Sequence, residues 1–332
     1  MMFHNGVRRL ARWIRASPDL LAMYATAATG MLCMRRNFVV QSHVGQRSLA
    51  GATKVAVLTH YDSSGRVHEF LVFYIKALRR AGFEIVLASN SPFLDIRDLT
   101  RMLPLCGLVL LRRNIGYDFG AYKDALAALG DLSRFDQVLL ANDSVYGPLF
   151  DLNAILARCD DSATVWGMTD SMERRYHLQC YFLLFRRGAL VHPCMTAFWR
   201  SVRPIQSRPW IIRRYEIGLT QTLLRAGVRC AALFPYHSVA ATRPGERLNM
   251  MHHYWQQSIR LGCPFIKREL LATNPWSLPD VPHWEGTIRA MCNYDTNLIT
   301  RHLEATLSEA GPNRQWSDSK QRRPHGTCPE RN

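Results

Sequence analysis

The sequence predicts an α/β fold in which a central, mostly parallel sheet lies between two layers of helices. Short apolar runs typical of buried strands alternate along the chain with longer segments whose apolar residues recur at helical spacing. Hydrophobic residues make up 48% of the 332 residues, which is enough for a full core. The prediction is therefore a three-layer α/β domain.

The first half of the chain repeats the strand–helix pattern. Residues 54–60 (KVAVLTH) have the composition of a buried strand, and Gly82 ends the amphipathic helix expected over 67–81. The elements expected next are a strand over 84–90, a short helix over 95–103, a strand over 107–112, a helix over 119–130 and a strand over 137–141. Successive β-α-β units of this kind form parallel sheets.

The second half changes character, because its first strands are not separated by long helices. The elements expected there are strands over 164–167 and 180–186, helices over 189–202 and 210–226, a strand over 228–233 and a helix over 250–261. We expect a basic N-terminal arm (1–53), a central domain (54–240), a helical C-terminal extension (241–310) over the acceptor side, and a disordered, Pro- and Arg-rich tail (311–332).

The charge is strongly positive and unevenly spread. Of the net +16, residues 1–53 contribute +6 and residues 311–332 contribute +3. No zinc-finger, basic-zipper or aromatic RNA-binding pattern accompanies this charge, which argues against a nucleic-acid partner and favours anionic lipid or a phosphorylated substrate. The arginines at 8, 9, 12 and 15 lie in a short amphipathic segment, which is either a peripheral membrane contact or a plain surface helix.

The cysteines and the apolar runs of the sequence indicate in which cellular compartment the protein is expected. Nine cysteines, an odd number without C-x-x-C spacing, favour a reducing environment. The apolar run over 20–34 is too short to span a bilayer and too weak for a convincing signal peptide. We therefore expect a cytoplasmic protein, with peripheral attachment at the inner face of the cytoplasmic membrane as one alternative.

Polar, glycine-bearing turns follow three of the expected strands, at the sheet edge where α/β proteins bind ligands. The candidate donor-binding residues in these turns are His60, Tyr61, Asp62, Arg113, Asn114, Gly116, Asp118, Asn142, Asp143 and Ser144. Arg112 and Arg113 can pair with phosphate oxygens, and Asp118 can cap the helix that follows, whose N-terminus is itself a phosphate site. Asp62 and Asp143 have an alternative interpretation as turn-forming residues.

Two groups of residues further along the chain suit the chemistry of sugar transfer. Asp143 is a single acid that can ligate a divalent cation, Mg²⁺ or Mn²⁺, bridging a diphosphate. Glu216 and Asp170 are candidate general bases. Trp166, His177 and Gln179 are candidates for contact with the acceptor or sugar, and Lys267 and Arg268 are candidates for holding the diphosphate. Helix-dipole, core or surface roles remain open for each of these side chains.

Seven ordered segments of the sequence resemble the rhamnan synthesis protein F family of bacterial polysaccharide glycosyltransferases. The segments are VAVLTHYD, RRNIGYDFGAYKDAL, LLANDSVYGPL, VWGMTDS, HLQCYFLLFRR, YEIGLTQTLLRAG and GCPFIKRELL, and together they cover roughly residues 50–280. The resemblance implies a GT-A-like, Rossmann-like fold and an inverting transfer of a deoxysugar, typically rhamnose from dTDP-rhamnose, to a lipid-linked glycan in lipopolysaccharide or O-antigen assembly.

The same resemblance bears on whether a metal is required and on which acid is the catalytic base. The Asp-x-Asp motif of such transferases is replaced by Asn142-Asp143-Ser144, which weakens the case for a required metal. Glu216, before a leucine-rich helix that ends at Gly227, matches the position of their catalytic acid better than Asp170 does. Two alternatives stay open: a nucleotide-sugar hydrolase or phosphotransferase, and a non-catalytic subunit of a polysaccharide assembly complex.

Overall fold

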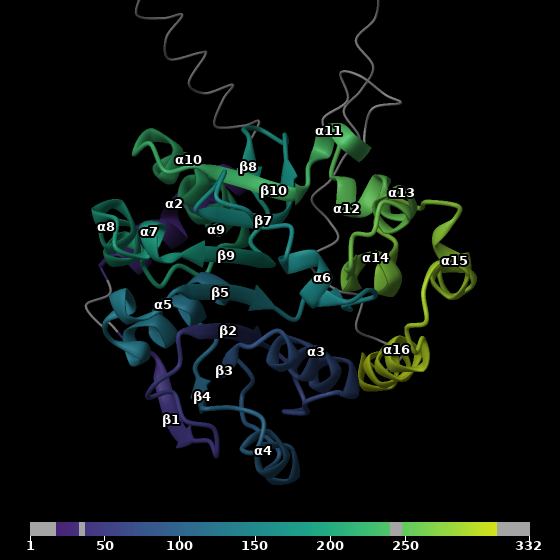
Figure 1. The fold of residues 1–332 in the computed structure, drawn as a ribbon, viewed down its shortest axis with the longest axis horizontal. Coiled ribbons are helices and arrows are strands. Elements are labelled where there is room, and N and C mark those ends of the chain that lie inside the picture. Colours follow the sequence, from purple (N-terminus) through teal and green to yellow (C-terminus); the bar gives the residue numbers. More distant parts are fainter. Residues whose placement is uncertain (1–17, 33–36, 240–247, 311–332) are drawn as a thin grey trace, which may run out of the picture.

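A nine-stranded mixed sheet runs through the middle of the molecule (Figure 1). The computed structural model describes residues 18–32, 37–239 and 248–310. The strand order is β1-β4-β3-β2-β5-β9-β7-β10, with β8 paired to β7. Six strands run in one direction, namely β2, β3, β4, β5, β7 and β10, and β1, β8 and β9 run against them. The α/β class and the mostly parallel sheet are confirmed.

The first half of the fold follows the expected order closely. It consists of β2 (Lys54–His60), α3 (Glu69–Arg80), β3 (Glu84–Ser89), α4 (Ile96–Met102), β4 (Leu108–Arg112), α5 (Tyr117–Leu129), a 3₁₀ turn (Leu132–Arg134) and β5 (Gln137–Asn142). Strands β2, β3 and β4 step outwards in one direction, and β5 then returns to the other side of β2. This reversal makes the crevice between β2 and β5 a topological switch point.

The second half inserts antiparallel strands. It contains β6 (Val145–Tyr146), α6 (Leu152–Leu156), β7 (Val165–Ser171), β8 (His177–Leu178), β9 (Phe182–Arg186), α7 (Arg187–Leu190), α8 (Pro193–Ser201), α9 (Arg208–Ile211), α10 (Ile217–Arg225) and β10 (Cys230–Phe234). Strand β9 lies between β5 and β7 and is antiparallel to both. The helix expected over 210–226 is interrupted by a π-helical turn over Ile212–Glu216.

Part of the expected N-terminal arm belongs to the domain. Strand β1 (Val39–Val44) pairs with β4 as an antiparallel edge strand. Helix α2 (Pro18–Met31) packs against α9, where Tyr24 meets Trp210 edge to face. Residues 39–44 therefore form part of the sheet, which does not begin at Lys54. The arginine-rich segment over 8–15 and the tail from 311 lie outside the described residues.

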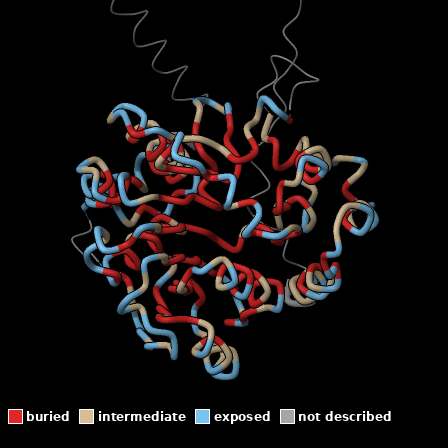
Figure 2. Tube along the Cα trace, in the orientation of Figure 1, coloured by how far each residue is buried: buried red, intermediate tan, exposed pale blue. Residues whose placement is uncertain are grey.

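Two hydrophobic clusters cover the two faces of the sheet, which makes the fold three-layered. Figure 2 shows buried stretches of chain in the middle of the molecule and exposed stretches around its outside. Along β2 the side chains alternate, so that Ala56 and Leu58 face one cluster while Val55 and Val57 face the other. Helices α3, α13 and α16 contribute to the first cluster, and α5, α8 and α10 contribute to the second. A sheet buried on both faces explains the continuous apolar runs.

The C-terminal extension is helical, as expected, and adds a short ribbon. It comprises α11 (Tyr236–Val239), α12 (Met250–His253), α13 (Trp255–Arg260), β11 (Ile266–Lys267), α14 (Arg268–Thr273), a 3₁₀ turn (Val281–His283), α15 (Trp284–Met291) and α16 (Asn297–Ala310). Strand β11 pairs antiparallel with β6, next to the switch point. No helix in residues 18–32, 37–239 and 248–310 has the length and apolarity to cross a membrane.

Candidate functional site at the switch point

The ends of β2 and β5 are tied together by Asp143. Its backbone N–H donates to the carbonyl of Thr59 at 3.1 Å, and its carboxylate Oδ2 accepts from the backbone N–H of Tyr61 at 3.1 Å. The side chain of Asn142 bends the chain after β5, because its Oδ1 accepts from the backbone N–H and hydroxyl of Ser144. The predicted turns after the first and fourth long strands therefore meet at one edge.

Asp118 joins this edge from the first turn of α5. Gly116 precedes the helix at a φ of 79°, and a Cβ on Gly120 would lie 2.3 Å from the carbonyl of Ile115, so both positions need glycine. This tight turn carries the Asp118 carboxylate to Thr59, whose hydroxyl donates to it at 2.9 Å, and to Asn142, whose amide donates at 2.9 Å.

The pKa of the Asp118 carboxyl is unusually high for an aspartate. Burial and the negative charge of Asp143 raise its pKa to about 6, against the lowering effect of its hydrogen bonds. The side chain keeps some contact with solvent. An acid of this kind at a ligand-binding edge exchanges protons near neutral pH.

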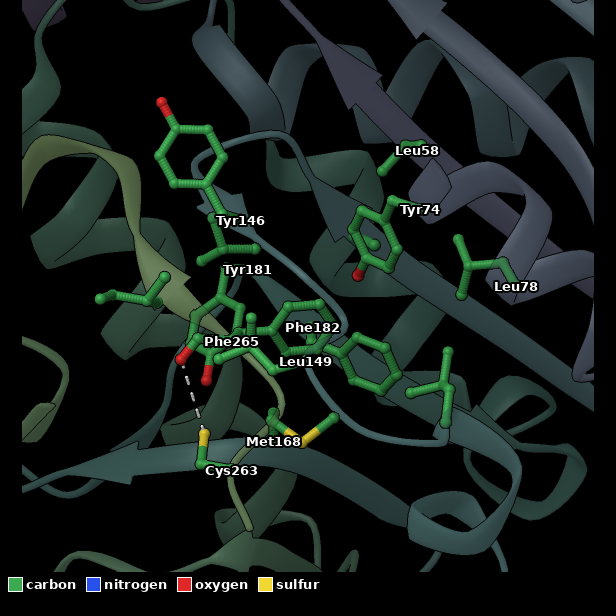
Figure 3. Close-up of a cluster of buried hydrophobic side chains, with 14 of the residues drawn as sticks. Leu58, Tyr74, Leu78, Tyr146, Leu149, Met168, Tyr181, Phe182, Cys263 and Phe265 are labelled. Carbon is green, nitrogen blue, oxygen red and sulfur yellow. Dashed lines mark hydrogen bonds between the residues drawn. The ribbon is translucent and has the colours of Figure 1, made fainter. Parts of the chain in front are cut away.

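The β6–β11 ribbon delivers two cationic side chains to the same edge. Phe265, immediately before β11, is buried against Tyr74, Tyr181 and Phe182, with ring centroids 5.1 to 5.9 Å away (Figure 3). This aromatic anchor fixes the ribbon, and the next turn of chain presents Lys267 and Arg268. The apolar part of the PFIKRELL segment thus positions its charged part.

Arg268 is seated on Asp143. Its Nη1 donates to the Asp143 carboxylate at 2.9 Å and to the Asp143 carbonyl at 2.7 Å, and its backbone N–H donates to Ser144. Behind it, His302 of α16 lies 3.3 Å from Nη2 and also contacts the hydroxyl of Tyr146 at 2.7 Å. Burial and the charge of Arg268 lower the pKa of His302 to about 2, so this imidazole is neutral.

Lys267 lies on the other side of Ser144. Its Nζ donates to the Ser144 hydroxyl at 3.2 Å and stands 4.5 Å above the ring of Tyr181. Burial lowers the pKa of Lys267, while the charges of Glu216, Glu269 and Asp118 act in the opposite sense. Asp118, Glu216 and Lys267 are therefore close enough to interact electrostatically.

Glu216 reaches this group from the π-helical turn that ends at it. The widened turn separates α9 from α10, and the Glu216 Oε1 accepts from the backbone N–H of Cys180 at 3.1 Å. Single π-helical turns inside helices are frequent at functional sites. The structure thus brings the preferred base candidate to the edge that holds Asp118, Asp143, Lys267 and Arg268.

Asp170, His177 and Gln179 form a neighbouring group at the ends of β7 and β8. The Asp170 carboxylate accepts from the backbone N–H of Tyr236 at 2.5 Å, so it holds the start of α11, and burial raises its pKa. The Gln179 side chain bonds the hydroxyl of Thr169 and the amide of Asn249. His177 is buried, with Nδ1 2.8 Å from the carbonyl of Arg175.

Several predicted donor contacts serve the protein itself. His60 is buried, with one ring nitrogen 3.1 Å from Ser89 and the other 3.0 Å from the carbonyl of Arg66, and burial lowers its pKa. Asp62 accepts from Ser64, Arg66 and His68, and these bonds lower its pKa despite burial. Asp62 thus makes the contacts of a turn-forming residue, and His60 makes those of a buried histidine.

Arg112 and Trp166 make their polar contacts within the protein. Arg112 is fully buried and paired at 3.0 Å with Asp124, so it holds the following loop instead of a phosphate. Trp166 lies near the start of β7, about four residues or roughly 13 Å along the strand from Asp170. Its ring is in the core and its Nε1 donates to Ala163, which corrects the prediction of an acceptor contact.

Gln206 forms hydrogen bonds with the backbone of the turn over Asn114–Gly116, which was expected to face a phosphate. Its Oε1 accepts from the Gly116 N–H at 2.7 Å, and its Nε2 donates to the Asn114 carbonyl at 2.6 Å. Arg113 is exposed, as is Tyr61. Gln206 and His302 were absent from the sequence-based site, because a lone amide or imidazole carries no signal without its neighbours in space.

The residues at this edge do not fit a resident divalent cation. No cluster of three or more His, Cys, Asp or Glu side chains suited to a metal occurs among the described residues. The Asp143 Oδ2 is already shared by the Tyr61 N–H and Arg268, and both Asp118 oxygens accept hydrogen bonds. A dication here would also be repelled by Arg268 and Lys267. The predicted Mg²⁺ or Mn²⁺ ligation by Asp143 finds no support in this geometry.

Fold and site together define an α/β protein with a cluster of charged side chains at the topological switch point of its sheet. The family model described as "Rhamnan synthesis protein F" matches residues 85–313, well over half of the chain. The chain belongs to the rhamnan synthesis protein F family. This membership confirms the resemblance drawn from the seven sequence segments.

The sequence identity to individual related proteins is low. The virulence protein VirA of Vibrio anguillarum is 29% identical over 227 residues, covering 60% of this chain and 72% of that protein. The uncharacterized protein y4gN of Sinorhizobium fredii is 30% identical over 186 residues, covering 54% of this chain and 48% of y4gN, about half of its length. Among solved structures, the WbbM bifunctional glycosyltransferase gives a TM-score of 0.36 at 11% identity, covering 77% of this chain and 53% of that one.

Proposed function

We propose that this protein is a glycosyltransferase of bacterial surface polysaccharide synthesis. It moves a deoxysugar, rhamnose, from a nucleoside-diphosphate donor such as dTDP-rhamnose to a lipid-linked glycan, with inversion at the anomeric carbon. Membership of the rhamnan synthesis family supports the substrate class. The fold supports it through the position of the charged cluster.

One observation carries the proposal. Asp118, Asp143, Glu216, Lys267 and Arg268 come from four distant parts of the sequence and converge on the carboxyl edge of β2 and β5. Cations suit a diphosphate, and the carboxylate of Glu216 suits a hydroxyl. A scaffold that binds no small ligand has no use for this convergence of partly buried charge.

The chemistry assigns a part to each side chain. Glu216 accepts the proton of the acceptor hydroxyl while the hydroxyl oxygen attacks the anomeric carbon. The bond from that carbon to the diphosphate oxygen breaks on the opposite face, and the nucleoside diphosphate leaves with the electron pair. Lys267 and Arg268 stabilise the charge that grows on the leaving diphosphate. Asp143 holds Arg268 in place.

A transfer assay tests the proposal. Purified protein is incubated with radiolabelled dTDP-rhamnose, or with UDP- and GDP-sugars, and with membranes that contain the lipid-linked acceptor, and labelled glycolipid is separated from free sugar. Glu216→Gln is expected to lower turnover at least 100-fold while leaving donor affinity within about threefold, because the base acts on the acceptor proton.

Asp143→Ala is expected to abolish transfer. The matched control is Asp151→Asn, since Asp151 is an exposed helix cap and asparagine caps equally well. Release of free sugar without acceptor points instead to a hydrolase. Wild-type transfer by the Asp143 variant, with its fold intact by circular dichroism, contradicts the site.

Peripheral attachment to the inner face of the cytoplasmic membrane forms part of the proposal. Support comes from the net charge of +16 and from the arginine-rich segment at residues 8–15. Flotation with vesicles of anionic and of neutral lipid tests it. Binding to anionic vesicles alone, lost when the four arginines are replaced by glutamine, is the expected result, and no binding to either vesicle contradicts it.

A further inference from the structure

We infer that Arg268, seated on Asp143 and flanked by Lys267, takes the place of a divalent cation, so that this site binds nucleoside diphosphates without metal. The inference rests on the proposed function and specifies how the donor diphosphate is held. It replaces the expectation that Asp143 ligates Mg²⁺ or Mn²⁺.

The position of Arg268 is fixed from four sides. Its backbone N–H bonds the Ser144 carbonyl, its guanidinium bonds both the carbonyl and the carboxylate of Asp143, and its Cζ lies 5.2 Å from the ring centre of Phe70. His302 closes the remaining side at 3.3 Å. A guanidinium held in this way is already oriented, and little side-chain entropy remains to be lost when a ligand binds.

The guanidinium still has donors to offer. It carries five N–H groups, and its contacts within the described residues use four acceptor atoms, two on Asp143, one on His302 and the hydroxyl oxygen of Tyr146. Its side chain is 23% exposed, so the remaining donors can reach a ligand. The planar fork of arginine matches the paired oxygens of a phosphate.

The charges around Asp143 favour this arrangement over a metal. A metal ion bound to the other oxygen of the Asp143 carboxylate, Oδ1, would lie close to the guanidinium that Oδ2 holds and would be repelled by it. Lys267, bonded to the hydroxyl of Ser144, the residue after Asp143, adds a second positive charge at the same edge of the sheet. Together the two side chains supply two positive charges, the same number that a divalent ion would bring to a diphosphate.

Calorimetry with the full chain tests the inference. The protein is titrated with dTDP, UDP and GDP, once with excess EDTA and once with excess Mn²⁺. We expect dissociation constants that agree within about threefold between the two conditions. Titration with Mn²⁺ alone is expected to give no heat of binding.

Three variants locate the effect. Arg268→Gln is expected to weaken nucleotide binding about 10- to 100-fold in EDTA, and Arg268→Lys, which keeps the charge without the fork, about 3- to 10-fold. Arg187→Gln is the matched control, because Arg187 pairs with Asp136 at 2.8 Å on the opposite edge of the sheet. The nucleotide affinity of the Arg187→Gln variant is expected to equal that of the wild type.

The possible outcomes distinguish metal-independent nucleotide binding from the proposed glycosyltransferase function. Binding that appears only with Mn²⁺ overturns this inference and leaves the proposed function standing. Absence of nucleotide binding in both conditions overturns both. Unchanged affinity in a folded Arg268→Gln variant also overturns the inference, even if binding is independent of metal.

Discussion

Replacing Asp118 by asparagine isolates the energetic effect of the charge that this site keeps partly buried. Asparagine has the same shape and can satisfy both neighbours, with Oδ1 accepting from the Asn142 amide and Nδ2 donating to the hydroxyl oxygen of Thr59. The substitution therefore removes the charge and leaves the hydrogen bonds. Any change in stability then reports on the carboxylate.

The expected magnitude follows from the pKa of Asp118, which is raised from the ordinary 3.8 to about 6. Because the folded protein binds this proton more tightly than the unfolded chain, stability is lost as the pH rises from about 4 through 6. The displacement corresponds to about 3 kcal/mol at neutral pH. Partial exposure to water reduces this to about 1–2 kcal/mol.

Urea unfolding of wild type and Asp118→Asn checks the prediction. At about pH 7.5 the variant is expected to be more stable by about 1–2 kcal/mol, and at about pH 4 the two should coincide. Asp151→Asn, at an exposed cap, controls for the loss of one negative charge and should show little difference at either pH. A variant that is equally or less stable than wild type at both pH values would refute the reasoning.

The remaining predictions concern the supports of the site. Gly120→Ala should destabilise the protein by about 3 kcal/mol in urea unfolding, because its Cβ would lie 2.3 Å from the Ile115 carbonyl, whereas Gly218→Ala, with open space around it, should stabilise by about 0.5–1 kcal/mol. A similar loss at both positions would contradict the role given to the tight turn. His302→Ala should raise the dissociation constant for dTDP about 3- to 10-fold in calorimetry, because Arg268 loses its rear contact. Unchanged affinity would show that Arg268 needs no support from α16.

Local patterns predicted the parallel half of the sheet well. The strand expected over 54–60 is β2 as observed, and β5 differs from its expected bounds by one residue. The antiparallel insertion of β9 had no such signal, because a strand buried on both faces has the same apolar composition in either direction. The β6–β11 ribbon is two residues long on each side, too short for any periodicity.

The candidate site, like the fold, could be predicted only in part from the sequence. Asp118, Asp143 and Glu216 were named because acids that follow strands or begin helices occur where ligands bind, and the fold brings them together. Whether a polar side chain serves a ligand or the protein depends on three-dimensional neighbours. Asp62 and His60 are used internally for that reason.

The contacts that complete the site join residues that are far apart in the sequence. Arg268 meets Asp143 across 125 positions, and Tyr146 meets His302 across 156. During synthesis the strands up to β5 leave the ribosome long before α16 does, at about 5–20 residues per second. The proposed diphosphate site therefore forms only after α16 has been made, so a chain cut short before residue 302 would retain much of the sheet and lack the finished site. Binding of the proposed donor would, by the same connection, couple the stability of α16 to that of strands β2 and β5.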